Sequence, residues 1–162
     1  LAAELEGVQF DFSWINRKLK ELEEAYGTVI VEGAGGLFVP LTTEGYCVID
    51  WMETLRVPAI VVAKAGVGTI NHTVLTIEAL NKRQIPIAGV ILNSIHNEEE
   101  AIVADNREMI HKLTNVPIIG SVPYCEDIRE TLANVEKRER CYGDWDFETI
   151  RRAMEIESTT IA

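Results

Sequence analysis

The sequence predicts an α/β fold built on a parallel β-sheet. Four short apolar segments rich in β-branched residues have the length of buried strands, and they occupy residues 28–31, 59–64, 87–93 and 116–120. Segments with helical spacing of apolar residues separate them, so that strands recur at intervals of about thirty residues. This alternation is typical of βαβ units, in which a crossover helix lets neighbouring strands run parallel.

Six helices are expected, at residues 13–26, 48–55, 71–82, 98–114, 128–135 and 147–155. Ser13 is the expected N-cap of the first helix, and Gly27 is expected to end it. Residues 1–12 are expected to be irregular or only briefly regular. The side chains expected to face the core are Val74, Leu75, Ile77 and Leu80 on the helix at 71–82, and Ile102, Met109, Ile110 and Leu113 on the helix at 98–114.

Composition excludes several classes of protein. The 162 residues include 47% hydrophobic residues and no internal repeat or linker, which predicts a single domain, residues 1–162. A net charge of −11 disfavours nucleic acid as a partner, because phosphate backbones need clustered lysine and arginine. The longest apolar segment, residues 57–63, is too short to span a bilayer, and the start of the chain lacks a signal-peptide pattern. Cys47, Cys125 and Cys141 share no metal-ligand or redox spacing, which fits reduced thiols in a cytoplasmic protein.

The segment that most suggests a function follows the first predicted strand. Glu32 ends that strand, and Gly33, Ala34, Gly35 and Gly36 come next. Glycine adopts positive φ without a steric penalty, so this backbone can turn tightly and approach a ligand. Free N–H groups in such a turn bind anions, and the adjacent carboxylate could hold a hard cation that bridges phosphate oxygens. The alternative is a plain strand-to-loop turn in which Glu32 is only solvated.

The ends of the other predicted strands also carry polar and glycine-containing segments. Lys64 precedes Gly66 and Gly68, Asn93 ends the third strand, and residues 123–125 (Pro-Tyr-Cys) follow the fourth. In open parallel sheets the ligand crevice lies beyond the carboxyl ends of the strands. We therefore expect on one side of the sheet a phosphate-binding turn, an amide suited to a base edge and a helix N-terminus suited to an anion. A plain turn role for Asn93 stays open.

Three motifs, in this order, resemble dethiobiotin synthetases. They are residues 31–36 (VEGAGG) followed by residues 39–41 (VPL), residues 68–72 (GTINH) leading into residues 75–76 (LT), and residues 88–93 (AGVILN). The first motif is shared with related amidoligases, whereas the three together are specific. The resemblance extends from Leu1 to Glu130.

The resemblance implies a P-loop NTPase-like three-layer fold and a homodimeric ligase of biotin biosynthesis. Such an enzyme converts 7,8-diaminopelargonate, CO2 and ATP into dethiobiotin, ADP and phosphate, with Mg²⁺ as cofactor. One amine becomes a carbamate, whose oxygen attacks the γ-phosphate of ATP, and the second amine then closes the ureido ring and expels phosphate. The protein contributes chiefly positioning and charge neutralisation to such phosphoryl transfer.

The resemblance also implies roles for individual residues. Glu32 would be a magnesium ligand at the ATP phosphates, directly or through water, and the backbone of the glycine turn would line the phosphates. The implied ATP-binding set is Glu32, Gly33, Ala34, Gly35, Asn93, Pro123, Tyr124, Cys125 and Glu130, the last five lying around adenine and ribose. The turn that would hold the carboxylate of the partner subunit's substrate comprises Val67, Gly68, Thr69 and Asn71. Ser94 stands where some members have an aspartate.

One feature of the family does not occur in the sequence. The family's phosphate-binding loop, G-x-x-x-x-G-K-[ST], supplies the catalytic lysine, and these 162 residues contain no such pattern. We therefore expect a fold incomplete at its N-terminus, the C-terminal two-thirds of a P-loop-type ligase, with no catalytic residue in this chain and little activity from it alone. Two alternatives stay open: a non-catalytic dimerising half that needs a separate P-loop chain, and a related P-loop ATPase of the partitioning type.

Overall fold

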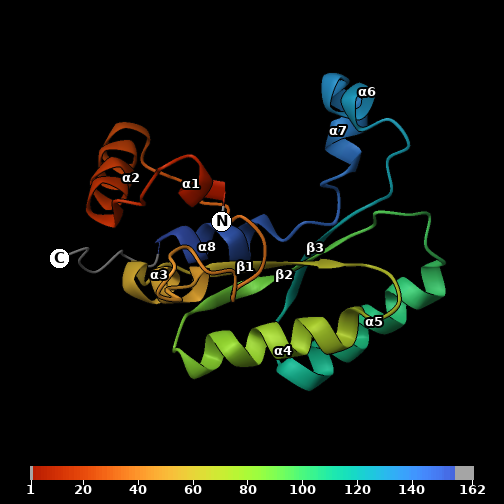
Figure 1. The fold of residues 1–162 in the computed structure, drawn as a ribbon. Coiled ribbons are helices and arrows are strands. Elements are labelled where there is room, and N and C mark those ends of the chain that lie inside the picture. Colours follow the sequence, from red (N-terminus) through yellow and green to blue (C-terminus); the bar gives the residue numbers. More distant parts are fainter. Residues whose placement is uncertain (1, 156–162) are drawn as a thin grey trace. The chain divides into compact units, whose positions relative to one another are not determined.

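A computed structural model of the protein describes residues 2–155 (Figure 1). The chain divides into two compact units, Leu1–Leu55 and Arg56–Ala162. That the 162 residues make a single domain stays a prediction. Among the described helices, none combines the length and the apolar composition that crossing a membrane requires.

The second unit is built on a parallel sheet, as predicted. Its strands β1 (Ala59–Lys64), β2 (Ile87–Asn93) and β3 (Ile118–Val122) lie in the order β1-β2-β3, and both pairs are parallel. The bounds of β1 and β2 agree with the prediction, whereas β3 begins two residues later than predicted. Pro117 has no N–H to donate to the ladder and only accepts, through its carbonyl oxygen, from Val90 N–H at 2.9 Å. The α/β fold class is confirmed.

The predicted strand at residues 28–31 is wrong. The described chain has three strands in its sheet, and residues 28–31 are in none of them. Among the described residues, no backbone hydrogen bond joins this segment to another, and Ile30 is 83% exposed. A strand is held by ladder hydrogen bonds to a neighbour, so an apolar sequence does not make one where that neighbour is lacking.

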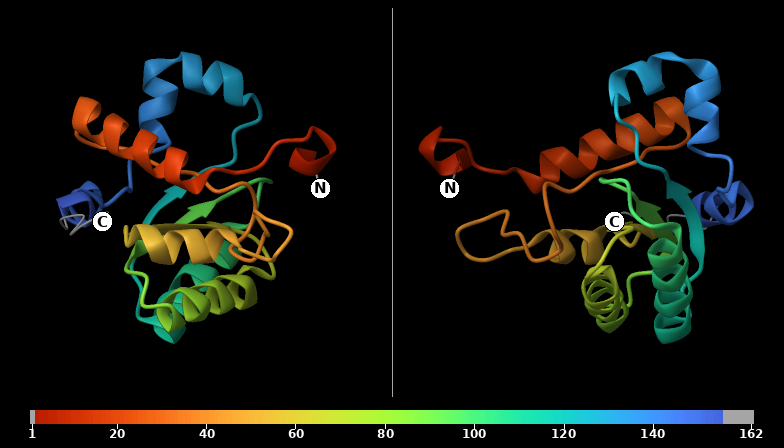
Figure 2. Two further views of the ribbon diagram at one scale, coloured as in Figure 1. Left: turned by 60° about the vertical axis from the view of Figure 1, so that its left-hand side comes forward. Right: turned by 90° about the vertical axis from the view of Figure 1, so that its right-hand side faces the viewer.

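Helices cover both faces of the sheet in the second unit (Figures 1 and 2). On one face lie α4 (Thr69–Lys82) and α5 (Glu100–Thr114), and on the other lies α8 (Phe147–Glu155). Ile150 of α8 packs against Ile91 of β2 and Ile119 of β3, with Val122 and Trp145 around them. The sheet is thus the middle layer of three, with its core on both sides.

Two leucines predicted to face the core are exposed. Leu75 of α4 is 55% exposed and Leu113 of α5 is 56% exposed. The buried residues of α4 are Thr69, Thr73, Ile77 and Leu80. These positions share one face at helical spacing, and Leu75 lies away from it. The prediction counted only apolar side chains as core-facing, whereas the buried face of α4 includes two threonines.

The predicted helix at residues 128–135 is in fact two short helices, α6 (Ile128–Ala133) and α7 (Val135–Arg140). Asn134 between them has extended backbone angles, φ −95° and ψ 118°, which end α6. Its side-chain oxygen accepts the N–H of Lys137 at 3.1 Å and so caps α7. A single asparagine therefore breaks and restarts the helix.

The first unit contains α1 (Ala2–Leu5), α2 (Phe12–Tyr26) and α3 (Val48–Leu55). The N-cap of α2 is Asp11 rather than the predicted Ser13, because the Asp11 carboxylate accepts Trp14 N–H at 2.9 Å. Gly27 ends α2 in the left-handed conformation, φ 74°, as predicted. Between α2 and α3, Trp51 Nε1 donates to Asn16 Oδ1 at 3.0 Å.

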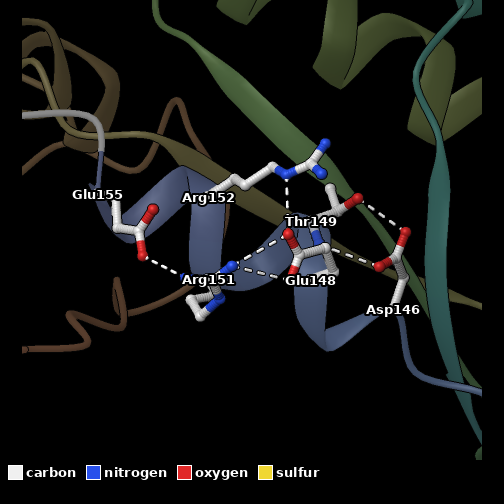
Figure 3. A network of polar contacts seen from close by, with 6 residues as sticks. All are labelled: Asp146, Glu148, Thr149, Arg151, Arg152 and Glu155. Carbon is white, nitrogen blue, oxygen red and sulfur yellow. Dashed lines mark hydrogen bonds and ion pairs between the residues drawn. The ribbon is translucent and has the colours of Figure 1, made fainter.

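A network of charged side chains lies along α8 (Figure 3). Asp146 caps the helix by accepting the backbone N–H of Thr149 at 2.9 Å and its hydroxyl at 2.7 Å. Glu148 accepts from Arg151 and Arg152 one turn further on. These ion pairs are exposed, and exposed pairs contribute little to stability, so we assign them to defining the start and surface of α8.

Candidate functional site

The carboxyl ends of the three strands meet at one edge of the sheet, as predicted. Lys64, Asn93 and Val122 are paired in register across β1, β2 and β3. Two backbone hydrogen bonds continue this order past the strands, from Ala65 N–H to the carbonyl of Asn93 at 3.0 Å and from Ser94 N–H to the carbonyl of Val122 at 2.9 Å. The loops after all three strands therefore start from a common edge, where a ligand crevice is expected.

The loop after β1 leads into an uncapped helix N-terminus. Gly68 precedes α4 with φ 86°, a conformation that favours glycine, and no side chain caps the helix. The first backbone N–H groups of α4 lack intrahelical partners, which makes them suited to an anion. Thr69 is buried with its hydroxyl 3.3 Å from that of Thr73, whereas Val67 and Asn71 are exposed. At Thr69, then, the backbone rather than the side chain is offered to a ligand.

Asn106 of α5 holds this turn in place by two hydrogen bonds. It is 5% exposed, and its Nδ2 donates to the carbonyl oxygens of Ala65 at 2.8 Å and Gly66 at 3.2 Å. Asn106 was not among the residues predicted from the sequence. The available signal was an asparagine between Ile102 and Ile110 on the apolar stripe of a helix, a position where a polar side chain needs a specific partner.

A cavity of about 380 Å³ lies where the chain leaves β3. Its lining includes four of the five residues predicted around adenine and ribose, Pro123, Tyr124, Cys125 and Glu130, whereas Asn93 is not among the lining residues. A second cavity of about 480 Å³ shares Pro123 and Tyr124 with the first and extends along the loop after β2 from Ser94. The structure therefore brings these four predicted residues to a shared cavity beside the carboxyl edge of the sheet.

Two basic residues of this cavity were not predicted. Lys137 and Arg140 of α7 line it, and Arg140 also lines the second cavity. Lys137 forms an ion pair with Glu130, so that carboxylate already has a cationic partner. The only signal in the sequence was the charged run at residues 137–140. Such a run predicts a solvated helix surface and does not indicate a cavity.

The two cysteines of the second unit face each other in the first cavity. Cys125 Sγ and Cys141 Sγ are 3.8 Å apart, although 16 residues separate them in the sequence, and all three cysteines of the chain are free thiols. Burial raises the pKa of the Cys141 thiol, and its contact with Cys125 adds to the rise. Cysteine spacing alone did not reveal this pair.

A carboxylate and an arginine fix the outer rim of the second cavity. Asp144 accepts Ser121 N–H at 3.1 Å and Arg107 at 3.2 Å, and Arg107 also donates to the Ser121 hydroxyl at 3.1 Å. Burial acts to raise the pKa of Asp144, but these hydrogen bonds outweigh it and hold the pKa below its usual value. This rim is structural, since its polar atoms are satisfied by one another.

The predicted glycine turn lies in the first unit. Gly35 has φ 96°, and a Cβ there would lie 2.9 Å from Val39 Cγ2, so the position requires glycine. Among the described residues, the backbone N–H groups of Gly33 and Ala34 have no acceptor. The turn is anchored by Ile49 N–H, which donates to the carbonyl of Leu37 at 2.9 Å. This segment offers free donors on a fixed backbone, as an anion-binding turn needs.

Glu32 is exposed at the start of this turn, beside the free N–H groups of Gly33 and Ala34. No group of three or more potential metal-ligating side chains occurs within residues 2–155. Mg²⁺ is commonly held by one or two carboxylates together with substrate phosphates and water rather than by an all-protein cage. A single exposed carboxylate beside a turn with free N–H groups fits a metal held in that way.

Comparisons with known proteins agree with the fold and the motifs. A family model described as an AAA domain matches residues 1–131. The chain belongs to the AAA domain family. This family supports the P-loop NTPase-like character of the fold that the sequence predicted.

Curated relatives are named ATP-dependent dethiobiotin synthetase BioD. The chain is 51% identical over 146 residues to the protein of Halalkalibacterium halodurans, covering 90% of this chain and 60% of the relative. It is 40% identical over 124 residues to that of Anoxybacillus flavithermus, covering 76% and 56%, and 36% identical over 144 residues to that of Clostridium acetobutylicum, covering 87% and 59%. The resemblance to dethiobiotin synthetases is confirmed, and the chain spans about three fifths of the length of these relatives.

Proposed function

We propose that the protein acts in biotin biosynthesis as an ATP-dependent dethiobiotin synthetase. In the proposed reaction an amine of 7,8-diaminopelargonate adds to CO2 to give a carbamate and a proton. A carbamate oxygen then attacks the γ-phosphorus of ATP, and ADP leaves. The second amine attacks the carbamate carbon, the ring closes to dethiobiotin, and phosphate leaves.

The observation that carries this proposal is the cavity beyond β3. The resemblance to dethiobiotin synthetases implies a nucleotide role for Pro123, Tyr124, Cys125 and Glu130, and all four line this cavity. An aromatic ring and a proline offer flat apolar contact to a purine. Asn93, at the end of the neighbouring strand β2, supplies an amide with the donor and acceptor pattern that an adenine edge needs.

The phosphates of ATP require groups of another kind. We assign them to the backbone of Gly33, Ala34 and Gly35, whose turn offers free N–H donors. Glu32 would hold Mg²⁺ together with phosphate oxygens. When bound, that ion would neutralise charge on the transferred phosphoryl group. The chain itself carries a net charge of −11, so such neutralisation is needed.

We assign the substrate carboxylate to the turn at residues 67–71 in a homodimer, with each subunit serving its partner. The uncapped N-terminus of α4 suits an anion. Exposed apolar residues beside it, Val67 at 84% and Leu75 at 55%, suit contact with a second copy.

Replacing Leu75 by glutamate should dissociate the dimer in sedimentation experiments. The matched variant Leu113→Glu changes an equally exposed leucine on α5 and should leave the dimer intact. Equal behaviour of the two variants would argue against this interface.

We propose that the 162 residues do not turn over ATP by themselves. They contain no G-x-x-x-x-G-K-[ST] pattern and hence no phosphate-binding lysine of that kind. Two alternatives stay open: a non-catalytic dimerising half that works with a separate P-loop chain, and a P-loop ATPase of the partitioning type.

We propose a cytoplasmic location, and neither nucleic acid nor a membrane as partner, in keeping with the acidic composition.

The deciding experiment measures phosphate release from ATP by the protein purified from its source, with and without 7,8-diaminopelargonate and CO2. The ligase requires the diamine for turnover, whereas an ATPase does not, so release that ignores the diamine would overturn the proposal. The 162-residue chain assayed alongside should be inactive.

The adenine role of Asn93 has its own test. Asn93→Ala should raise the KM for ATP, whereas the control Asn81→Ala, at the exposed end of α4, should leave it unchanged.

A second pair of variants tests the metal. Glu32→Ala should lower turnover and raise the Mg²⁺ concentration needed for half-maximal activity. Glu44→Ala removes another exposed carboxylate from the same unit and should change neither quantity. An unchanged Mg²⁺ requirement in Glu32→Ala would remove the metal from this residue.

A further inference from the structure

We propose that Cys125 and Cys141 form a dithiol–disulfide site on the wall of the first cavity. Their sulfur atoms are 3.8 Å apart, and a disulfide needs a separation of about 2.05 Å, so the two atoms must approach by roughly 1.8 Å. Both residues line the same cavity. Two free thiols from separate segments, already in contact, are placed for intramolecular bond formation.

The backbone around the pair allows that approach. Cys125 lies in the loop between β3 and α6, and Cys141 directly follows the last residue of α7. Neither residue is held inside a strand or in the middle of a helix. The Cys125 thiol donates only a weak bond, 3.5 Å long, to the carbonyl of Pro123, and the Cys141 thiol donates one of 3.4 Å to the carbonyl of Lys137. Small loop adjustments can therefore bring the sulfur atoms together.

The two thiols have different environments, which sets the order of the chemistry. Cys125 is half-buried, whereas Cys141 is 7% exposed and burial raises its pKa. The oxidant is a low-molecular-weight disulfide of the glutathione type. The Cys125 thiolate attacks one of its sulfur atoms, forming a mixed disulfide and releasing one thiolate. Cys141 then loses its proton, attacks the Cys125 sulfur and releases the second thiolate. Two protein thiols are oxidised and one small disulfide is reduced to two thiols.

The bond would join the loop after β3 to the end of α7 on the wall of the cavity. Tyr124 is adjacent to Cys125, and Arg140 is adjacent to Cys141, so the bond would shift two residues that line the cavity. This consequence rests on the proposed nucleotide role of the cavity, whereas formation of the bond does not. If adenine binds there, the oxidised protein should bind ATP more weakly, by about tenfold for the loss of contacts worth about 1.4 kcal/mol.

The third cysteine provides the matched control. Cys47 belongs to the first unit, and its sulfur contacts the carbonyl oxygens of Gly45 at 3.3 Å and Phe38 at 3.7 Å. Like Cys125 it is half-buried. It therefore reports reactivity that depends on exposure alone.

The test treats the purified protein with oxidised glutathione, denatures it, and measures its free thiols and intact mass. The wild type should fall from three free thiols to one and lose the mass of two hydrogen atoms. Cys47→Ser should fall from two to none. Cys125→Ser and Cys141→Ser should form no intramolecular disulfide. Three free thiols in the treated wild type, or disulfide-linked dimers in place of the internal bond, would overturn the inference.

ATP binding to the reduced and oxidised protein separates this inference from the proposed function. Weaker binding after oxidation supports both. Loss of two thiols with no ATP binding in either state keeps the dithiol site and contradicts the nucleotide role. Loss of two thiols with equal ATP affinity in both states refutes the effect of the bond on the cavity.

Discussion

A substitution of Asn106 is the strictest test of how the turn before α4 is held in place. Replacing it by leucine preserves most of its shape and removes both donors to the carbonyl oxygens of Ala65 and Gly66. Ala65 is 1% exposed, so water does not readily replace the lost donor. An unsatisfied buried polar group costs about 1–3 kcal/mol. The cost of leaving two such carbonyl oxygens unsatisfied exceeds the free energy that leucine gains by burying apolar surface. We therefore expect a net loss of about 1–3 kcal/mol in the free energy of unfolding.

The assay is urea unfolding followed by circular dichroism. Small proteins lose about 1–3 kcal/mol per molar urea, so the midpoint of Asn106→Leu should fall by about 1 M relative to the wild type. Glu108→Leu places the same side chain at an exposed position of α5 and should shift the free energy by less than about 0.5 kcal/mol. Hydrogen exchange gives a local readout, because the N–H of Ala65, which donates to Asn93, should exchange faster once the turn is released.

An unchanged midpoint with unchanged exchange at Ala65 would refute the argument that Asn106 holds the turn. A lower midpoint with unchanged exchange at this turn would make Asn106 a general core residue instead. In the active protein, a released turn should raise the KM for the diamine more than the KM for ATP, provided the proposed function holds. Equal changes in both constants would argue against a positioning role.

Three further predictions concern the fold. Gly120→Ala should destabilise the protein by about 1–3 kcal/mol in thermal unfolding, because a Cβ there would lie 2.7 Å from the ring of Trp145. Since hydrogen bonds hold the pKa of Asp144 in the folded state below its unfolded value, its stabilising contribution is fully present above the unfolded pKa and is lost as the pH falls through the folded pKa. Asp144→Asn should therefore flatten this part of the stability–pH curve, and an unchanged curve would contradict the shift. Asp11→Ala should cost about 1 kcal/mol and increase hydrogen exchange in α2, whereas Ser13→Ala should not.

The elements with strong local signals were predictable from the sequence. The bounds of α3, β1, β2 and α8 agree with the prediction residue for residue. Each is a short apolar or amphipathic segment whose ends are marked by proline, glycine or polar residues. The segment at 28–31 is as rich in β-branched residues as β1 and yet forms no strand. The difference lies in pairing, which a window of sequence does not contain.

The candidate site was predictable where it follows from strand topology. A parallel sheet sends the carboxyl ends of its strands to one edge, so the sequence suffices to assign Asn93 and the segment at 123–125 to a common edge. The partners of these residues could not. Asn106 contacts a turn 40 residues earlier in the chain, and Cys141 contacts a cysteine 16 residues away. Such contacts depend on how the elements pack, and although the sequence marks Asn106 as a polar residue on an apolar stripe, it does not identify the partner of either residue.

Helix α4 shows how a wrong assignment can still inform the function. A helix with leucine on one face and buried threonines on another has two surfaces to cover, and the second unit covers only the threonine-bearing one. Leu75 is left exposed one turn beyond backbone N–H groups that no side chain caps. Apolar surface beside an uncapped helix N-terminus is the combination that the proposed substrate, an aliphatic chain with one carboxylate, would require. The face that the core prediction misplaced is therefore the one on which the proposed substrate and dimer contacts depend.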